Sequence, residues 1–363
     1  MNTLLKLIPP IWSCRNILRY QFFRGLNHLA EIDDTRLIIS NLLRSLNIIS
    51  TGPELTDSRP ADIPYIELRR PTEDRGTRFR DDIIFVTGRF RSGSSLIWNL
   101  FRNMPSVTAF YEPFNERRWF DKSHRGTHVD PTHSNITEYW SEYEGLEVLS
   151  NYYDENWTRR QLYMNSEAWK PAMQRYIEIL IESAKGRPVL QFNRTDLRLP
   201  WLKARFPHSK ILHIFRHPRD QWCSTLIDIS RLPRSGTLRE FEAVDGFYLL
   251  RWARDLQNYF PFLTTEVDKH PYEIFYSIWK LSYVFGRNYA DVSIAFEDLI
   301  SQPTKTIENM LSDLSFDNTD VTRLVALVRP ASTGKWNRYG DHEWFSAIEA
   351  KVDNIFHNFF AKV

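Results

Sequence analysis

The chain has 363 residues, with 47 Lys and Arg against 45 Asp and Glu, which leaves a formal net charge of only +2. This balance excludes a protein that binds polyanions such as nucleic acid through its overall charge. The length permits a large core, the composition is that of an ordinary globular protein, and no apolar run reaches the roughly 18 residues of a membrane span.

Residues 1–80 are expected to form an N-terminal helical extension and a linker that precede one folded domain over residues 81–363. Apolar residues recur at helical spacing over 1–50, where four basic side chains precede the first acid, Glu31: Lys6, Arg15, Arg19 and Arg24. Such a segment either covers the core or makes a peripheral membrane contact. The polar, proline-rich stretch 51–82 predicts the linker.

Two features of the chain predict a cytoplasmic protein. Pro9 and Pro10 interrupt the early apolar run, which does not fit a signal peptide. The only cysteines, Cys14 and Cys223, are too few for a disulfide framework, so a reducing compartment is the simplest expectation.

Short β-rich segments then alternate with helical patterns. Strands are predicted over 83–87, 107–111, 188–193, 210–215 and 291–297, and helices begin near Ser94, Leu199 and Pro218. This alternation predicts an α/β fold with a central parallel sheet flanked by helices. Because ligands bind outside the carboxyl ends of such strands, the turns that follow them are expected to share one functional rim.

The first turn, "GRFRSGSS" over residues 88–95, has the glycine spacing of a loop that binds nucleoside triphosphates, but Ser94 stands where that loop has its lysine. Small residues at a helix start still expose backbone N–H groups to a phosphate. We therefore predict an anion cradle made by Ser92, Gly93, Ser94 and Ser95, with Arg91 as a charged donor. The alternative is a plain glycine turn that packs a helix on a strand.

A second anion site is predicted after the strand 210–215. In "FRHPRDQWCS", Arg216 directly follows the strand and Ser224 lies two helical turns later, so that both can hold one phosphate. The alternative is that Arg216 is a surface residue. A basic loop over 329–344 contains Gly334, Lys335 and Trp336, and either folds over a nucleotide or is a solvated turn.

With these motifs the chain resembles the sulfotransferases that use 3′-phosphoadenosine-5′-phosphosulfate (PAPS). The resemblance runs from residue 83 to 350 and implies a P-loop-like three-layer fold, without a catalytic metal. It implies that "RSGSS" cradles the 5′-phosphosulfate, that Arg216 and Ser224 bind the 3′-phosphate, and that the "GKW" loop over 334–336 closes on the nucleotide. The segment "FEDL" over 296–299 also matches the family pattern.

The motif "RSGSS" is most similar to the carbohydrate and tyrosyl-protein branch and its bacterial relatives, which implies a glycan acceptor. Where that branch has a lysine after the third strand, this chain has Arg194. Two alternatives stay open: sulfation of a small metabolite or lipid alcohol, and a P-loop kinase, although the missing lysine argues against the latter.

Sulfuryl transfer needs a base for the acceptor proton and cations near the transferred group. Glu112 follows the second strand and is our candidate base, with Arg91 and Arg194 as the catalytic cations. The alternatives make Glu112 an ion-pair partner of a rim arginine, or take the base from one of three histidines: His124, His128 and His133. Their spacing does not favour a metal site.

The segments 113–187 and 230–290 exceed what a nucleotide-binding core needs and are expected to shape the acceptor site. Aromatic residues are dense between 110 and 170. They either stack on sugar rings or fill the core, and the sequence alone leaves both open.

Overall fold

The computed structural model describes residues 80–361, except residues 134, 266–268, 318 and 332. Residues 1–79 hold nearly all of the predicted extension and linker. That prediction, and the proposed membrane contact, therefore lie outside the described residues.

Five parallel strands form one sheet in the order β2-β3-β1-β4-β5. They are β1 (Ile84–Thr87), β2 (Val107–Tyr111), β3 (Arg187–Phe192), β4 (Lys210–Phe215) and β5 (Val292–Ala295). All four residues of the central strand β1 are buried, as expected for a parallel sheet covered on both faces. The predicted α/β fold with a central parallel sheet is confirmed.

The last strand is shorter than predicted. We expected it to run to residue 297, but β5 ends at Ala295 and the helix α10 (Phe296–Ser301) begins at the next residue. Glu297 and Asp298 lie in the first turn of α10, where acidic side chains complement the helix dipole. That local preference ends the strand earlier than its apolar pattern indicates.

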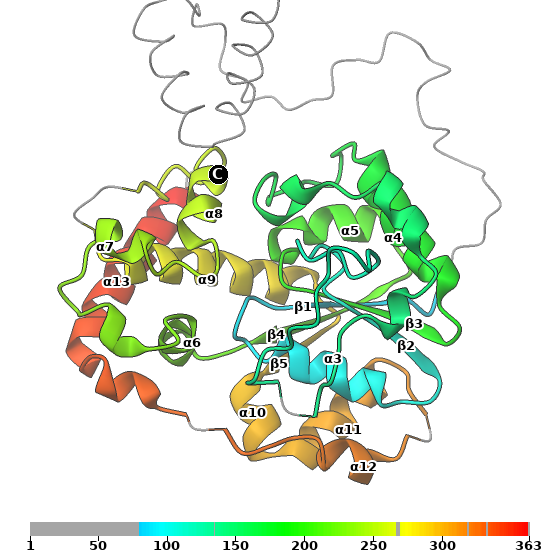
Figure 1. The fold of residues 1–363 in the computed structure, drawn as a ribbon. Helices are drawn as coiled ribbons and strands as arrows, with labels where there is room; N and C mark the ends of the chain where they lie inside the picture. The colour runs from blue at the N-terminus through cyan, green and yellow to red at the C-terminus, as the bar shows by residue number, and fades with distance from the viewer. Residues whose placement is uncertain (1–79, 134, 266–268, 318, 332, 362–363) are drawn as a thin grey trace, which may run out of the picture. The chain divides into compact units, whose positions relative to one another are not determined.

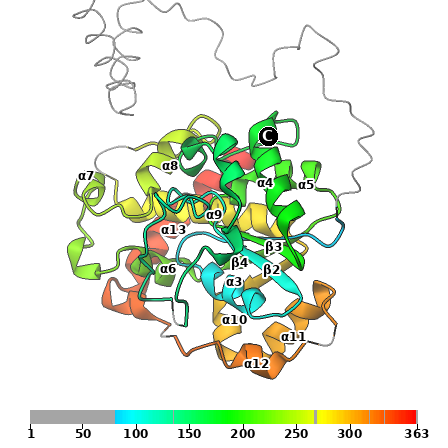
Figure 2. The same ribbon diagram turned by 45° about the vertical axis from the view of Figure 1, so that its right-hand side comes forward.

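Helices cover both faces of the sheet (Figures 1 and 2). On one side lie α3 (Ser94–Arg102), α10, α11 (Pro303–Asp313) and α12 (Val321–Val325). On the other side lie α4 (Pro171–Ser183), α5 (Leu199–Arg205) and α9 (Pro271–Tyr289). This arrangement gives the three layers that the resemblance implied.

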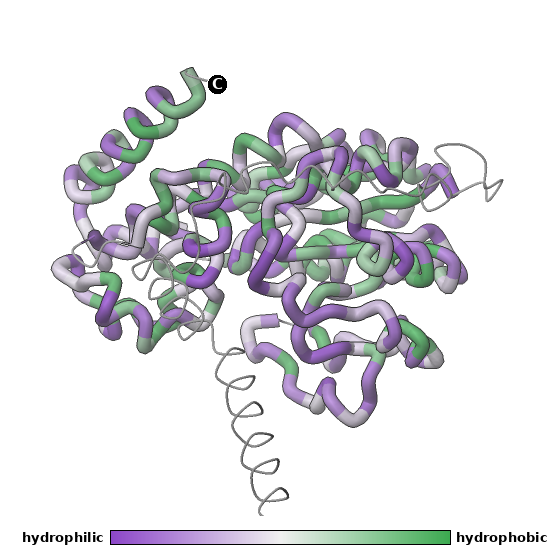
Figure 3. The backbone as a smooth tube through the Cα atoms, turned by 90° about the horizontal axis from the view of Figure 1, so that it is seen from above, coloured by the Kyte–Doolittle hydropathy of each residue, from purple (hydrophilic) through white to green (hydrophobic). Residues whose placement is uncertain are grey.

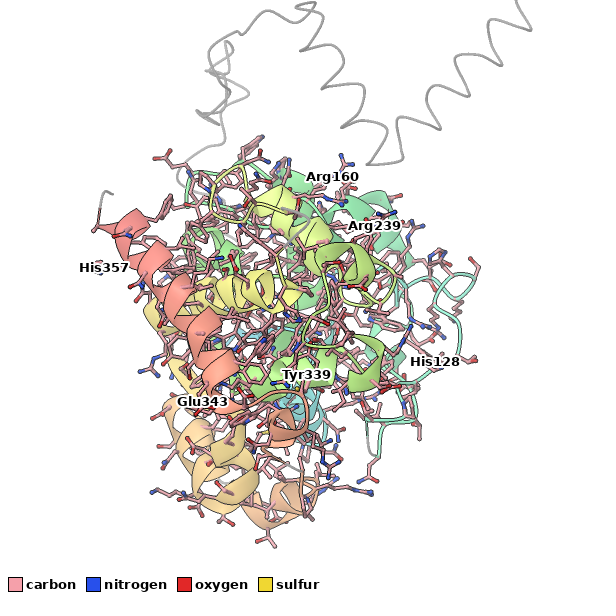
Figure 4. All side chains as sticks on the ribbon, turned by 90° about the vertical axis from the view of Figure 1, so that its left-hand side faces the viewer. His128, Arg160, Arg239, Tyr339, Glu343 and His357 are labelled. Atoms are coloured by element: carbon pink, nitrogen blue, oxygen red, sulfur yellow. The ribbon has the colours of Figure 1, made fainter. Side chains whose placement is uncertain are left out.

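A second apolar cluster lies beside the sheet, around α6 (Pro218–Thr225), α7 (Leu238–Glu242), α8 (Leu249–Leu256), α9 and α13 (His342–Phe360). Trp222 of α6 is fully buried in it. Hydrophobic and hydrophilic residues alternate along α13 in Figure 3, and the helix buries Phe345, Val352 and Phe356. Tyr339, labelled in Figure 4, lies just before α13 and is buried. Its hydroxyl oxygen forms a hydrogen bond with His270 Nε2 at 3.0 Å. These five helices thus supply most of a second core, against which Phe90 of the loop after β1 and Trp336 also pack.

Short 3-10 helices complete the connections: η2 (Ser141–Tyr143), η3 (Glu147–Asn151), η4 (Glu155–Thr158), η5 (Asp196–Arg198), η6 (Ile229–Arg231) and η7 (Lys335–Arg338). In the connection from β2 to α4, the side chains of Trp119, Tyr139, Tyr143 and Trp157 are buried in the main core. Most of the dense aromatic residues are therefore core residues rather than an exposed stacking surface. No helix among the described residues is long and apolar enough to cross a membrane.

Candidate active site

The loop that joins β1 to α3 is fixed by two glycines. A Cβ atom at Gly88 would lie 2.6 Å from the carbonyl oxygen of Ile214, so only glycine fits the close approach of this loop to β4. Gly93 precedes α3 with a φ of 99°, in the left-handed region that favours glycine. Both predicted glycine positions are thus required by the backbone geometry.

The start of α3 is suited to an anion. Gly93 supplies no side-chain cap and the first turn holds no acid, so the N–H groups there stay available for a ligand. The hydroxyl of Ser92 is buried and has no hydrogen-bond partner among the described residues. Ser94 donates to Asn193 Oδ1 at 2.7 Å, and Ser95 lies 3.1 Å from the Tyr111 hydroxyl. A phosphate or sulfonate oxygen would satisfy both the loop amides and Ser92.

Arg91, Arg216 and Ser224 come together although they are far apart in the sequence. Arg91 Nε donates to Ser224 Oγ at 3.0 Å, and Arg216 Nη1 donates to the Arg91 carbonyl at 3.4 Å. Burial lowers the pKa of Arg216, and its Nε has no acceptor within the part of the chain that the structure describes. Two arginines and a hydroxyl thus converge beside the cradle, where their unused donors can hold anionic oxygens.

The loop that contains Gly334 and Trp336 is docked on the start of α6. The Gly334 N–H donates to Asp220 Oδ2 at 2.8 Å, and the Trp336 N–H donates to Asp220 Oδ1 at 3.4 Å. The Trp336 ring stacks on His217, with 6.3 Å between the ring centroids, whereas Lys335 is exposed. The loop is therefore held next to Arg216 and Ser224 rather than projecting as a free turn.

Glu112 directly follows β2, and both oxygens of its carboxylate accept hydrogen bonds. Its Oε2 accepts from Arg194 Nη1 at 2.8 Å and from Asn115 Nδ2 at 2.7 Å, and its Oε1 accepts from Asn193 Nδ2. The residue is buried and has a φ of 38°. The ion pair that the sequence offered as an alternative to a base is thus present, while the role of Glu112 as a base stays a prediction.

Arg194 joins two carboxylates. Besides Glu112, it pairs with Glu116 at 2.7 Å, and its guanidinium lies 4.9 Å from the Phe90 ring centroid. Burial disfavours the charged guanidinium and so lowers the pKa of Arg194. The two carboxylates favour the charged form more strongly, and the pKa of Arg194 is raised. Asn193 extends this network to the cradle, because its side chain accepts a hydrogen bond from Ser94 and donates one to Glu112. Arg194 and Glu112 are therefore linked to the loop through one amide side chain.

The non-glycine residues Arg91 and Glu112 both adopt positive φ angles, 66° and 38°. Each such residue costs on the order of 1–3 kcal/mol, and such strain concentrates where a site needs an exact side-chain direction. Glu112 directly follows β2 and Arg91 lies four residues beyond the end of β1, both at the rim, and six further non-glycine residues among those described also have positive φ angles.

Of the three histidines, only His133 approaches the rim. Its Nδ1 lies 2.6 Å from the Tyr139 hydroxyl, and Tyr139 stacks on Tyr111 with 4.4 Å between the ring centroids. Burial lowers the pKa of His133, which favours the neutral ring that can accept a proton. His124 and His128 are exposed, and Figure 4 shows His128 at the periphery of the molecule.

The sequence reasoning missed three residues of the site. Asn193 connects the cradle to Glu112, Asp220 anchors the loop over 334–336, and Asp130 pairs with Arg91 at 3.3 Å. Asn193 is the last residue of a predicted strand, at the rim, and that position was the available signal. No local sequence pattern indicates the roles of Asp130 and Asp220, because their hydrogen-bond partners Arg91 and Gly334 lie 39 and 114 residues away in the chain.

Across residues 80–361, with the gaps given above, no group of three or more His, Cys, Asp or Glu side chains is arranged to hold a metal ion.

A sequence model described as the sulfotransferase family matches residues 82–320, more than half of the chain. No curated protein matches it. Similar solved structures include the sulfotransferase STF1 of Mycobacterium tuberculosis, at 14% identity and a TM-score of 0.41, covering 74% of this chain and 76% of that one.

Two further solved structures are similar at the same remote level. A sulfotransferase from Alicyclobacillus acidocaldarius has 16% identity and a TM-score of 0.36, covering 76% of this chain and 94% of that one. The mouse sulfotransferase SULT7A1, complexed with PAP, has 14% identity and a TM-score of 0.38, covering 77% of this chain and 84% of that one.

Proposed function

Because the chain belongs to the sulfotransferase family, we propose that it transfers the sulfuryl group of PAPS to an acceptor hydroxyl and releases adenosine 3′,5′-bisphosphate (PAP). The observation that carries this proposal is the convergence of Arg91, Arg216 and Ser224 beside the free start of α3. PAPS has anionic groups at both its 5′ and 3′ positions. A cradle with an adjoining pair of arginines suits such a ligand.

The residues at the rim have distinct roles in this proposal. The backbone amides over 93–95 hold the phosphosulfate, and Arg91 offsets the negative charge that builds on the leaving phosphate. Arg216 and Ser224 hold the 3′-phosphate, and the Trp336 loop covers the nucleotide. Glu112 removes the acceptor proton, with Arg194 fixing its direction. The chemistry is direct in-line transfer and requires no metal.

For the acceptor, the sequence motif "RSGSS" favours a carbohydrate, and that remains a proposal carried by the resemblance. A second candidate, an apolar alcohol, is favoured by a specific observation: most aromatic residues between 110 and 170 are buried in the core and cannot stack on sugars.

We expect PAP to bind tightly without a metal and 5′-AMP to bind much more weakly, because AMP lacks the 3′-phosphate that Arg216 and Ser224 would hold. Arg216→Ala is expected to weaken PAP binding by roughly 2–4 kcal/mol, the usual cost of a lost charge-assisted contact. Isothermal titration calorimetry with and without a chelator measures both effects.

The matched control is Arg231→Ala, which removes an exposed arginine at the end of η6. It should leave PAP binding unchanged. Equal affinities for PAP and AMP in the unmodified protein would show that these residues do not read a 3′-phosphate.

A further inference from the structure

Tyr111 is the last residue of β2, and its hydroxyl reaches the cradle. The residue is only 5% exposed, and its hydroxyl oxygen lies 3.1 Å from Ser95 Oγ. Ser95 is the second residue of α3 and is partly exposed, whereas the preceding Ser94 is buried and donates to Asn193. A buried phenol thus contacts the one serine hydroxyl of this helix start that is open to a ligand.

Aromatic side chains hold the Tyr111 ring in place. Tyr139 stacks on it, with 4.4 Å between the ring centroids and 16° between the ring planes. The rings of Trp98 and Trp119 lie 4.8 Å and 6.0 Å away, centroid to centroid. These three neighbours are themselves buried. Because buried side chains pack closely, the Tyr111 ring has little freedom to turn its hydroxyl away from the cradle.

The hydrogen bond between Tyr111 and Ser95 has a favoured direction. Each hydroxyl carries one proton, so only one of the two can donate to the other. A phenol is more acidic than an aliphatic alcohol and is therefore the better donor. Burial raises the pKa of Tyr111, and the charge of Glu112 raises it further, so the phenol keeps its proton at neutral pH. Tyr111 therefore donates to Ser95, and the Ser95 proton stays free for a ligand.

Glu112 is the acid that could compete for the Tyr111 proton. Its carboxylate oxygens already accept hydrogen bonds from three side chains: Asn115, Asn193 and Arg194. The hydrogen bond that the geometry gives to the phenol is the one with Ser95.

We propose that Tyr111 is a positioning residue of the donor site, which makes the Ser95 hydroxyl a donor to the phosphate at the 5′ end of the nucleotide. The proposal rests on the sulfotransferase function proposed above and adds a residue to its donor site. A serine hydroxyl without such a partner can turn its oxygen rather than its proton toward the anion. The phenol fixes the proton in the useful direction before the ligand arrives, as in other preorganised anion sites.

Two nucleotides and two variants test this by isothermal titration calorimetry. PAP carries the 5′-phosphate, and 3′-AMP lacks it. Tyr111→Phe keeps the ring but removes the hydroxyl, so it should weaken PAP about fivefold and change 3′-AMP binding less than about twofold. Ser95→Ala removes the donor itself and should weaken PAP about tenfold or more, again without an effect on 3′-AMP.

The double variant separates positioning from packing. If Tyr111 acts through Ser95, adding Tyr111→Phe to Ser95→Ala should weaken PAP by less than about twofold more. Independent effects would instead multiply to about fiftyfold. Full multiplication, or an equal loss for PAP and 3′-AMP, would show that Tyr111 only supports the fold and would overturn the proposal. Normal PAP affinity in Ser95→Ala would overturn it as well, even if Tyr111→Phe does not fold.

Tyr176→Phe is the matched control. Tyr176 is fully buried in the same core, and its hydroxyl donates to the Pro113 carbonyl at 2.7 Å. Its loss should lower the melting temperature about as much as Tyr111→Phe does, and should leave both nucleotide affinities within about twofold of the unmodified protein. If Tyr176→Phe weakens PAP as much as Tyr111→Phe, the loss reflects general destabilisation and the proposal is wrong.

Turnover distinguishes this proposal from the proposed function. The nucleotide pattern described above, without sulfation of any alcohol, would support the role of Tyr111 in binding while the proposed function fails. Sulfation with unchanged PAP affinity in Tyr111→Phe, and with a shifted pH dependence of kcat, would show that the phenol donates to Glu112 instead and that the proposal is wrong. Absence of PAP binding by the unmodified protein would overturn both.

Discussion

Replacing Glu112 by glutamine is expected to lower kcat by roughly 10² to 10⁴, the usual effect of removing a general base. Glutamine keeps the shape of the side chain, but it replaces one accepting carboxylate oxygen by an NH2 group that donates, and it cannot take the acceptor proton. PAP affinity should stay within about threefold, because Glu112 acts on the acceptor rather than on the nucleotide. Steady-state turnover and calorimetry on the same preparation measure the two effects.

The ion pair with Arg194 makes a matched control necessary. Loss of one partner of a buried pair destabilises a protein by about 3–5 kcal/mol, which can reduce activity without any role in catalysis. Glu116 is the other carboxylate that pairs with Arg194, and the Glu116 side chain is 35% exposed. Glu116→Gln removes this carboxylate and leaves Glu112 in place. If Glu116→Gln reduces kcat as much as Glu112→Gln does, positioning of Arg194 explains both effects.

A third variant decides between the candidate bases. His133 lies beside Tyr139 and Tyr111 at the same rim, and burial favours its neutral form. If Glu112→Gln retains kcat within a few-fold and His133→Asn loses it, the histidine is the base and our assignment is wrong.

Replacing Arg91 by alanine is expected to damage both binding and turnover. The guanidinium lies at the mouth of the cradle, held by Ser224 at 3.0 Å and Thr132 at 3.2 Å, so its charge acts on the phosphosulfate before and during transfer. We expect PAP affinity to fall about tenfold or more, and kcat by roughly 10² to 10³, as for other lost donors to a developing anion.

Arg91→Lys separates the charge of this side chain from its geometry. Lysine keeps the charge but not the planar donor fork, so it should restore part of the PAP affinity and less of kcat. If Arg91→Ala binds PAP normally and turns over at the normal rate, Arg91 serves only to pair with Asp130.

The architecture was predictable because it depends on local patterns. Each of the five strands is a short apolar run, and a parallel sheet follows from helices between them. The cradle was predictable for the same reason: Gly88, Gly93 and the serines at the start of α3 lie within eight residues. The largest boundary error is the end of the last strand, since Phe296 and Glu297 fit the alternating pattern of a strand but begin α10.

The choice of partner for each charged side chain was not predictable, although the sequence did offer an ion pair between Glu112 and an arginine of the rim. Glu112 and Arg194 are 82 residues apart, and Arg91 and Ser224 are 133 apart, so no local pattern indicates that they meet. Long-range packing, rather than local preference, decides which polar groups are left for a ligand.

Transfer of labelled sulfur from PAPS to an alcohol tests the central claim most directly. The full-length protein is incubated with sulfur-labelled PAPS, a chelator and a panel of glycans, lipid alcohols and hydroxylated aromatic acids, and the products are separated and weighed by mass spectrometry. We predict a labelled sulfate ester on at least one alcohol, with PAP released in equal amount and no dependence on metal. Failure to sulfate any alcohol, together with magnesium-dependent phosphorylation of the panel from ATP, would contradict the account.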